Sequence, residues 1–184
     1  MENDIEKLKF PIGKYKAILE FNFSRTIQDI KTLESFANNL KDSVKGLDKT
    51  DFKKTYRDGG MNIAQIIHHY CDTHTYAFLR TKHTLLEDNP SVKMYEVSEF
   101  LTTPESNVLD VEDSLKVIEG IHAKWVSLLK TLSENDFNKT YYHSARDKNI
   151  ILHGHVGMYA WHNKHHLVHI GMAKESIKEK GKRS

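Results

Sequence analysis

Residues 150–177, IILHGHVGMYAWHNKHHLVHIGMAKESI, decide the fold because they combine a helical apolar period with a concentration of histidines. Apolar side chains recur there at the spacing of one face of an α-helix. They form a stripe of Ile151, Met158, Tyr159, Ile170 and Ala173. The stretch is therefore predicted to be one long amphipathic helix whose stripe packs against other helices.

Three further stretches show the same period, at about residues 24–47, 62–87 and 113–132. The second of them begins with Asn62 and Gln65, a variant of the capping box that starts helices. The chain has only three prolines and nine glycines, which favours helices over a turn-rich β fold. Four helices of this length in 184 residues predict an all-α four-helix bundle.

The chain is expected to form a single domain over residues 1–184, since no repeat or linker divides it. Residues 1–23 form an N-terminal extension, and the basic residues 178–184 are expected to fray at the C-terminal end. A long connection, residues 89–112, joins the second and third helices. Connections of this length are usually lids, binding loops or crossovers between distant helix ends.

Composition narrows the class of protein. Lys and Arg number 27 against 25 Asp and Glu, so the formal charge of +2 gives no field that favours nucleic acid or a membrane surface. The sequence has no apolar run long enough to span a membrane, and its charged first residues are unlike a signal peptide. One cysteine excludes an internal disulfide. A cytoplasmic protein without nucleic-acid or membrane partners is expected.

Twelve histidines are many for this length, and four of them lie within residues 162–169. His162 and His166 are one turn apart, the spacing at which a single helix supplies two imidazoles to a metal ion. His165 and His169 have the same spacing, so spacing alone does not choose the pair. His162 and His166 lie near the middle of the apolar stripe, which favours them because ligands project into a bundle. A purely structural role in packing is the alternative.

The third ligand is expected from the helix at residues 62–87. His69 lies at the border of its apolar side, whereas His68 points further outward. Arg80 shares a line with His69, which makes it a candidate for binding an anion. Three imidazoles would leave coordination positions open, as in a catalytic metal site. Histidines without clear partners are expected on the surface or in structural roles: His83, His122, His143, His153 and His155.

Several motifs, in this order, resemble the YfiT-like branch of the DinB superfamily. They are Pro11-Ile12-Gly13-Lys14-Tyr15, Tyr56-Arg57-Asp58-Gly59-Gly60, His68-His69 with Asp72 and His74, and Trp161-His162 with His165-His166 and His169-Ile170. The match extends over nearly the whole chain. Met61 departs from it, because a tryptophan usually follows the glycine pair in the family.

The resemblance implies a cytoplasmic four-helix bundle, often homodimeric, that holds zinc or nickel through His69, His162 and His166. It implies a metal-dependent hydrolase or, as in some relatives, a transferase that adds a low-molecular-weight thiol such as bacillithiol to electrophiles. The expected partner is therefore a small-molecule substrate. A metal- or ligand-binding protein without catalytic activity is the alternative.

The sequence indicates the catalytic and substrate-positioning residues less clearly than it indicates the metal ligands. Asp72 lies next to the turn that carries His69 and is a candidate for orienting an imidazole. Tyr56, Arg57, Asp58 and Arg80 are candidates for positioning an anionic cosubstrate. No general base is identified from the sequence.

Overall fold

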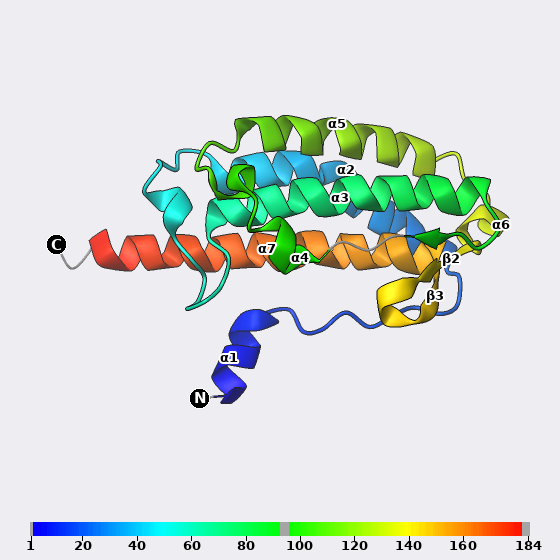
Figure 1. The fold of residues 1–184 in the computed structure, drawn as a ribbon, viewed down its shortest axis with the longest axis horizontal. Coiled ribbons are helices and arrows are strands. Elements are labelled where there is room, and N and C mark those ends of the chain that lie inside the picture. The colour runs from blue at the N-terminus through cyan, green and yellow to red at the C-terminus, as the bar shows by residue number, and fades with distance from the viewer. Residues whose placement is uncertain (1, 93–95, 182–184) are drawn as a thin grey trace.

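The computed structural model describes residues 2–92 and 96–181, with side chains over 4–92 and 96–176. Four long helices form a bundle (Figure 1), and they correspond to the four predicted stretches. They are α2 (Phe23–Val44), α3 (Ile63–Leu86), α5 (Glu112–Leu129) and α7 (Leu152–Gly181). Shorter helices are α1 (Glu2–Lys9), α4 (Val97–Phe100) and α6 (Glu134–Phe137), with 3₁₀ turns at Asp51–Lys53, Pro104–Asn107 and Ser144–Arg146. The predicted four-helix bundle is confirmed.

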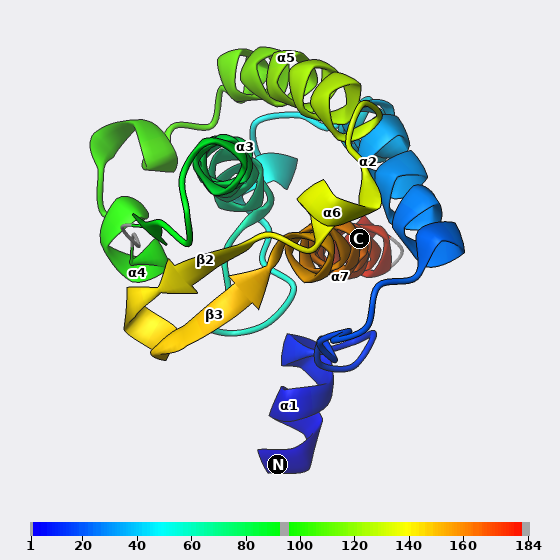
Figure 2. The same ribbon diagram turned by 90° about the vertical axis from the view of Figure 1, so that its right-hand side faces the viewer.

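The order of the helices around the bundle explains the long connection. Helices α2 and α3 each pack against both α5 and α7, and the end-on view in Figure 2 shows α2 and α3 at diagonal positions. Helices α3 and α5 run parallel, since His68 contacts Ser114 and, further along, Thr81 contacts Trp125. The segment 87–111 must therefore return along the length of the bundle, which makes it a crossover.

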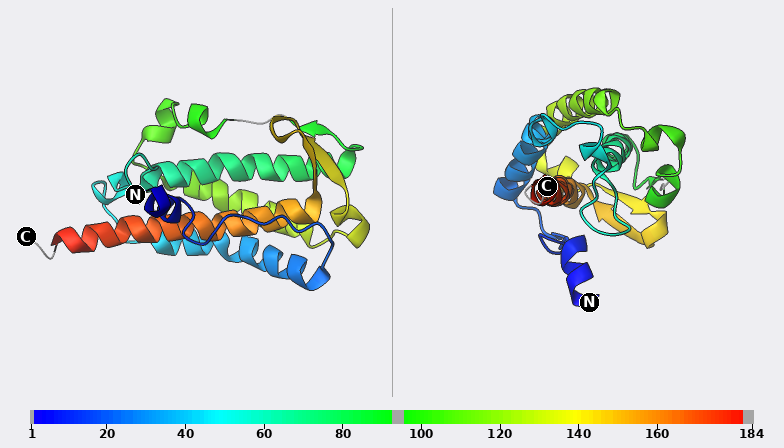
Figure 3. Two further views of the ribbon diagram at one scale, coloured as in Figure 1. Left: turned by 90° about the horizontal axis from the view of Figure 1, so that it is seen from below. Right: turned by 90° about the vertical axis from the view of Figure 1, so that its left-hand side faces the viewer.

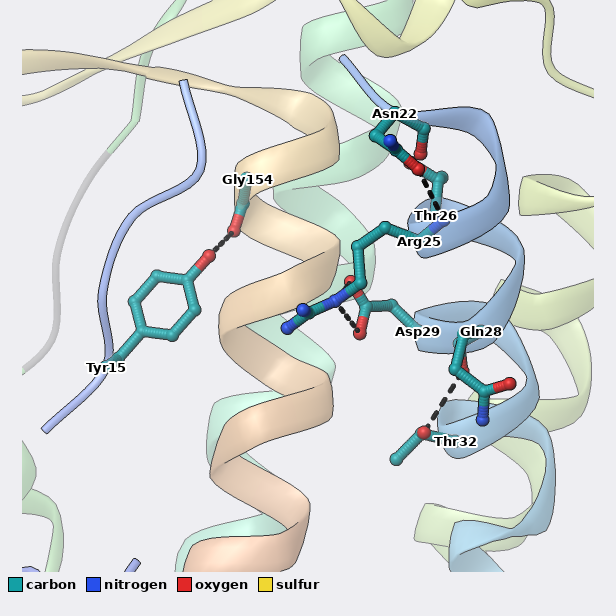
Figure 4. A network of polar contacts seen from close by, with 8 residues as sticks. All are labelled: Tyr15, Asn22, Arg25, Thr26, Gln28, Asp29, Thr32 and Gly154. Atoms are coloured by element: carbon teal, nitrogen blue, oxygen red, sulfur yellow. Dashed lines mark hydrogen bonds and ion pairs between the residues drawn. The ribbon is translucent and has the colours of Figure 1, made fainter. Parts of the chain in front are cut away.

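Side chains at the helix starts satisfy the exposed backbone amides. Asn62 Oδ1 accepts a hydrogen bond from the Gln65 amide at 2.8 Å, and Gln65 Oε1 accepts one from the Asn62 amide at 3.0 Å. The predicted capping box of α3 is therefore confirmed. Asn22 caps α2 by accepting from the Arg25 amide at 2.9 Å (Figure 4).

A small sheet at one end of the bundle was not predicted. Its strands, β1 (Ser91–Val92), β2 (Thr140–His143) and β3 (Lys148–Ile151), lie in the order β1-β2-β3, with β1–β2 parallel and β2–β3 antiparallel. Ile150 pairs with Tyr141 and Ile151 with Thr140. The prediction that the fourth helix begins at Ile150 is therefore wrong: residues 150–151 belong to a strand, and the helix begins at Leu152.

The N-terminal extension is tied to α7. The Tyr15 hydroxyl donates to the Gly154 carbonyl at 2.9 Å (Figure 4), and the Leu8 carbonyl lies 3.1 Å from His169 Nε2. Seen from below in Figure 3, the segment after α1 follows α7. The described backbone of α7 is helical to Gly181, and residues 182–184, the end of the tail expected to fray, lie outside the described part. None of the described helices is long and apolar enough to cross a membrane.

The interior consists of two apolar clusters separated by a layer of histidines. One cluster includes Phe36, Ile66 and Ile170, and the other includes Leu33, Trp125 and Leu152. Buried His74, His122 and His166 and half-buried His162 occupy the positions between the two clusters on α3, α5 and α7. This polar layer positions the candidate site in the middle of the bundle.

Candidate metal centre

The structure brings together the three predicted ligands. His69 on α3 and His162 and His166 on α7 each offer a ring nitrogen, and these atoms all lie within 4.8 Å of one another. His69 Nε2 and His162 Nε2 are 3.1 Å apart. His69 and His166 are buried and His162 is half-buried. The antiparallel pair α3 and α7 therefore builds one compact three-histidine cluster.

A chain of hydrogen bonds fixes which nitrogen of His162 carries the proton. The Leu33 carbonyl can only accept, so His122 Nδ1, at 2.7 Å, donates to it. His122 Nε2 then accepts from His74 Nδ1 at 2.6 Å, and His74 Nε2 accepts from His162 Nδ1 at 3.3 Å. In neutral His162 the lone pair is thus on Nε2, the atom that faces His69.

A second chain of hydrogen bonds fixes which nitrogen of His166 carries the proton. The Leu8 carbonyl accepts from His169 Nε2 at 3.1 Å, so His169 Nδ1 accepts from His166 Nδ1, also at 3.1 Å. His166 Nε2 is left with its lone pair. Two backbone carbonyls on different elements therefore leave the Nε2 lone pairs of both α7 histidines available to the cluster.

The cluster fits a divalent ion. Burial lowers the pKa of His69 to about 4 and holds the pKa values of His162 and His166 well below the ordinary value, so all three imidazoles are neutral ligands at pH 7. The 3.1 Å between His69 Nε2 and His162 Nε2 is close to the roughly 3.3 Å separating two nitrogens bound tetrahedrally at about 2.0–2.1 Å from one ion. Neutral imidazoles suit zinc, nickel and similar ions alike.

His165, His166 and His169 form a second compact group of nitrogens. It is a poorer ligand set, because both nitrogens of His169 already take part in hydrogen bonds. The His165 ring is stacked between Phe10 and Trp161, at centroid distances of 5.9 and 4.5 Å. These contacts make the group a support for His166.

A cavity of about 220 Å³ adjoins the cluster. His69 and His162 line it from the bundle, together with Arg80 on α3. The sheet side contributes His143 and Arg146. No aspartate or glutamate is among its lining residues in the described part of the chain. The cavity therefore places two arginines, and no carboxylate, near the candidate metal ligands.

The other predicted candidates lie elsewhere. Asp72 is on the side of α3 that faces Glu105 and His68, and burial followed by the Glu105 charge raises its pKa. Within the described residues, the ligand imidazoles make their hydrogen bonds to histidines and not to Asp72. Its predicted role in orienting an imidazole is therefore taken by His74 and His169.

Tyr56, Arg57 and Asp58 lie behind the ligands and do not line this cavity. The Tyr56 ring is stacked on His169 with centroids 3.7 Å apart and planes 10° from parallel. Arg57 donates to the Asp58 carbonyl at 2.7 Å. Of the residues predicted to position an anion, the structure places only Arg80 in the cavity.

Most of the histidines expected on the surface or in structural roles are buried. His122, His143, His153 and His155 all have exposed fractions of 5% or less, and His68, expected to point outward, is 6% exposed. His83 is exposed and contacts Glu87. The sequence held a signal for the buried position of His122, which continues the apolar period of α5, and for that of His74, which continues the period of α3.

Comparison with known proteins shows the family and the fold of the chain. The profile of the DinB superfamily matches residues 32–170. A Geobacillus kaustophilus protein named "Putative metal-dependent hydrolase GK0616" is 33% identical over 171 residues, 93% of this chain and 96% of the relative. "Putative metal-dependent hydrolase YfiT" from Bacillus subtilis is 31% identical over 163 residues, 89% and 92% of the two chains. The solved structure of YfiT, described as a probable metal-dependent hydrolase with an unusual four-helix bundle topology, matches with a TM-score of 0.90, covering 94% of this chain and 98% of that one at 30% identity.

Proposed function

The chain belongs to the DinB superfamily, and from that premise we propose that it is a metal-dependent hydrolase whose ion is held by His69, His162 and His166. The observation that carries the proposal is that backbone carbonyls direct the lone pairs of both α7 histidines into one cluster beside a cavity. Three imidazoles leave coordination positions for water and substrate. When bound, such an ion lowers the pKa of a water or a thiol and polarises the electrophile.

The residues around the cluster bind and orient the substrate. Ile150, Met158 and Trp161 give the cavity an apolar wall that excludes bulk water from the reacting groups. His143 Nδ1 accepts from the Arg146 amide at 3.1 Å, so the proton of neutral His143 is on Nε2, ready to donate to a substrate oxygen. Burial, followed by the Arg146 charge, lowers the pKa of His143 and keeps it neutral.

The nucleophile is water or a low-molecular-weight thiol. A thiol is kept as the second candidate because Arg80 and Arg146 make the cavity positive, which favours a thiolate over the neutral thiol. Both reactions would use the same three ligands. The cavity volume of about 220 Å³ restricts either substrate to a small molecule.

Metal content tests the ligand set. Protein purified without a histidine tag is expected to hold about one ion per chain, measured by elemental analysis, and His69→Ala or His162→Ala is expected to lose it. His165→Ala is the matched control, because His165 belongs only to the second group of histidines. Loss of metal in His165→Ala with retention in His69→Ala would show that the second group is the site.

Activity assays distinguish water from a low-molecular-weight thiol as the nucleophile. The loaded protein is assayed with panels of esters and amides, and with bacillithiol plus an electrophile. We expect hydrolysis that disappears with the metal in His162→Ala. Transfer of the thiol without hydrolysis would support the second candidate. Stoichiometric metal without either activity would indicate a binding protein.

A further inference from the structure

Arg80 is a buried cation for which the described residues supply no counter-ion. Its exposed fraction is 4%, and its Nε and Nη2 atoms are buried without a hydrogen-bond partner in the described part of the chain. Nη1 has a single contact, the Tyr159 hydroxyl at 3.5 Å, which is at the limit of a hydrogen bond. The guanidinium carbon lies 5.4 Å from the Tyr76 ring centroid. Removing a guanidinium from water without pairing it is unfavourable, so this arrangement calls for an anionic partner.

The surroundings of Arg80 leave room for such a partner inside the candidate site. Arg80 lines the same cavity as His69 and His162. Arg146 adds a second positive charge from the turn between β2 and β3, and its described side-chain contact is to the Met158 sulfur at 4.0 Å. No described aspartate or glutamate lines the cavity or pairs with either arginine. The described part of the chain therefore supplies no anion to this cavity, and a bound small molecule could supply it.

We propose that Arg80 is a carboxylate-binding subsite and that the substrate, or its cosubstrate, is a small molecule carrying a carboxylate. The proposal rests on the proposed function, since it places the reacting group of that molecule beside His69 and His162. A guanidinium presents two parallel N–H donors that match the two oxygens of a carboxylate. The apolar side chains of Val97, Ile150 and Met158 would cover the carbon skeleton.

The first experiment measures succinate and acetate binding by calorimetry in protein stripped of metal with EDTA, so that carboxylate–metal contacts do not contribute. We expect saturable binding that weakens by roughly 10-fold or more in Arg80→Met, because charge-assisted hydrogen bonds are lost. Lys82→Gln removes the same charge from the same helix at an exposed position and is the matched control. Equal affinity in the wild type and Arg80→Met would overturn the proposal, as would binding of inorganic phosphate but not of carboxylates.

A second measurement follows binding in the wild-type protein and uses a conservative variant for assignment alone. The Nε–H signal of Arg80, identified by its absence from the NMR spectrum of Arg80→Lys, is followed in the wild type during a succinate titration. A saturable shift with the calorimetric affinity is expected, and a signal that stays in place while succinate binds would overturn the subsite.

The experiments can refute the metal-dependent hydrolase and the carboxylate subsite independently of each other. Arg80-dependent succinate binding by the stripped protein, combined with no bound metal in the protein before EDTA treatment, would refute the hydrolase centre and leave the subsite intact. Stoichiometric metal with succinate affinity independent of Arg80 would refute the subsite alone.

Discussion

The orienting groups of His162 differ from the carboxylates that often support metal-bound histidines. Its Nδ1 proton is accepted by His74, and the chain then passes through His122 to the Leu33 carbonyl. A carboxylate in this place would raise the basicity of the ligand and give more charge to the ion. A chain of neutral imidazoles orients the ring without adding charge, so the ion would keep more of its Lewis acidity.

This arrangement predicts that His74 determines metal affinity without touching the ion. In His74→Phe an aromatic ring fills the site, but His162 loses its acceptor and the ring is no longer held in one orientation. We expect a loss of roughly 10- to 100-fold in zinc affinity, measured by competition with a chelator. His83→Phe, an exposed change on the same helix, should bind zinc as the wild type does. Unchanged affinity in a folded His74→Phe protein would exclude an orienting role.

At the level of helices and strands, local signals could be predicted and contacts between distant segments could not. The α3 start follows from Asn62 and Gln65, two residues three positions apart that cap each other, so the sequence contains the whole signal. His68 was expected to point outward because the period of one helix does not show what covers its second face. The crossover and the start of α5 cover that face: His68 lies 3.1 Å from the Val108 carbonyl of the crossover and 2.8 Å from the Ser114 hydroxyl of α5.

At the candidate site, too, contacts between distant segments could not be predicted. The one-turn spacing of His162 and His166 and the family resemblance sufficed to predict the three histidines that the structure brings together. The cavity could not be predicted, because one wall comes from a hairpin whose strand residues Ile150 and Ile151 continue directly into α7. The alternation of buried Tyr141 and His143 in β2 was a weak signal for that strand.

We expect the capping box of α3 to contribute measurably to the free energy of unfolding. Asn62→Ala removes the acceptor of the Gln65 amide and should lower the free energy of unfolding by about 1 kcal/mol, measured by urea denaturation. Asn39→Ala is the matched control, since Asn39 is exposed in the middle of α2, where alanine is the better helix former. Equal stability of the Asn62→Ala protein and the wild type would mean that packing alone fixes this helix end.

For the molecule as a whole, the histidine layer links folding to pH. Burial lowers the pKa of His122 to about 4 and, together with the smaller effect of the Arg80 charge, that of His155 to about 3. An unfolded histidine titrates near 6.5. Between these values the unfolded chain binds protons that the folded protein does not, so stability falls as the pH is lowered through this window. Above pH 6.5 both states are neutral and the effect disappears.

His155 allows this linkage to be measured, because it does not contact the candidate metal ligands. Its ring nitrogens face the Tyr141 hydroxyl at 2.9 Å and the Ala77 carbonyl at 3.2 Å, and the other nearby charged or titratable side chains are those of His74, Arg80, His143 and Tyr159. None of these groups is an acid that would hold a proton on His155. In EDTA, the wild type should lose about 2 kcal/mol more unfolding free energy than His155→Gln between pH 7 and pH 5. Urea denaturation at both pH values measures the difference, and parallel losses in the two proteins would mean that His155 is protonated in the folded state.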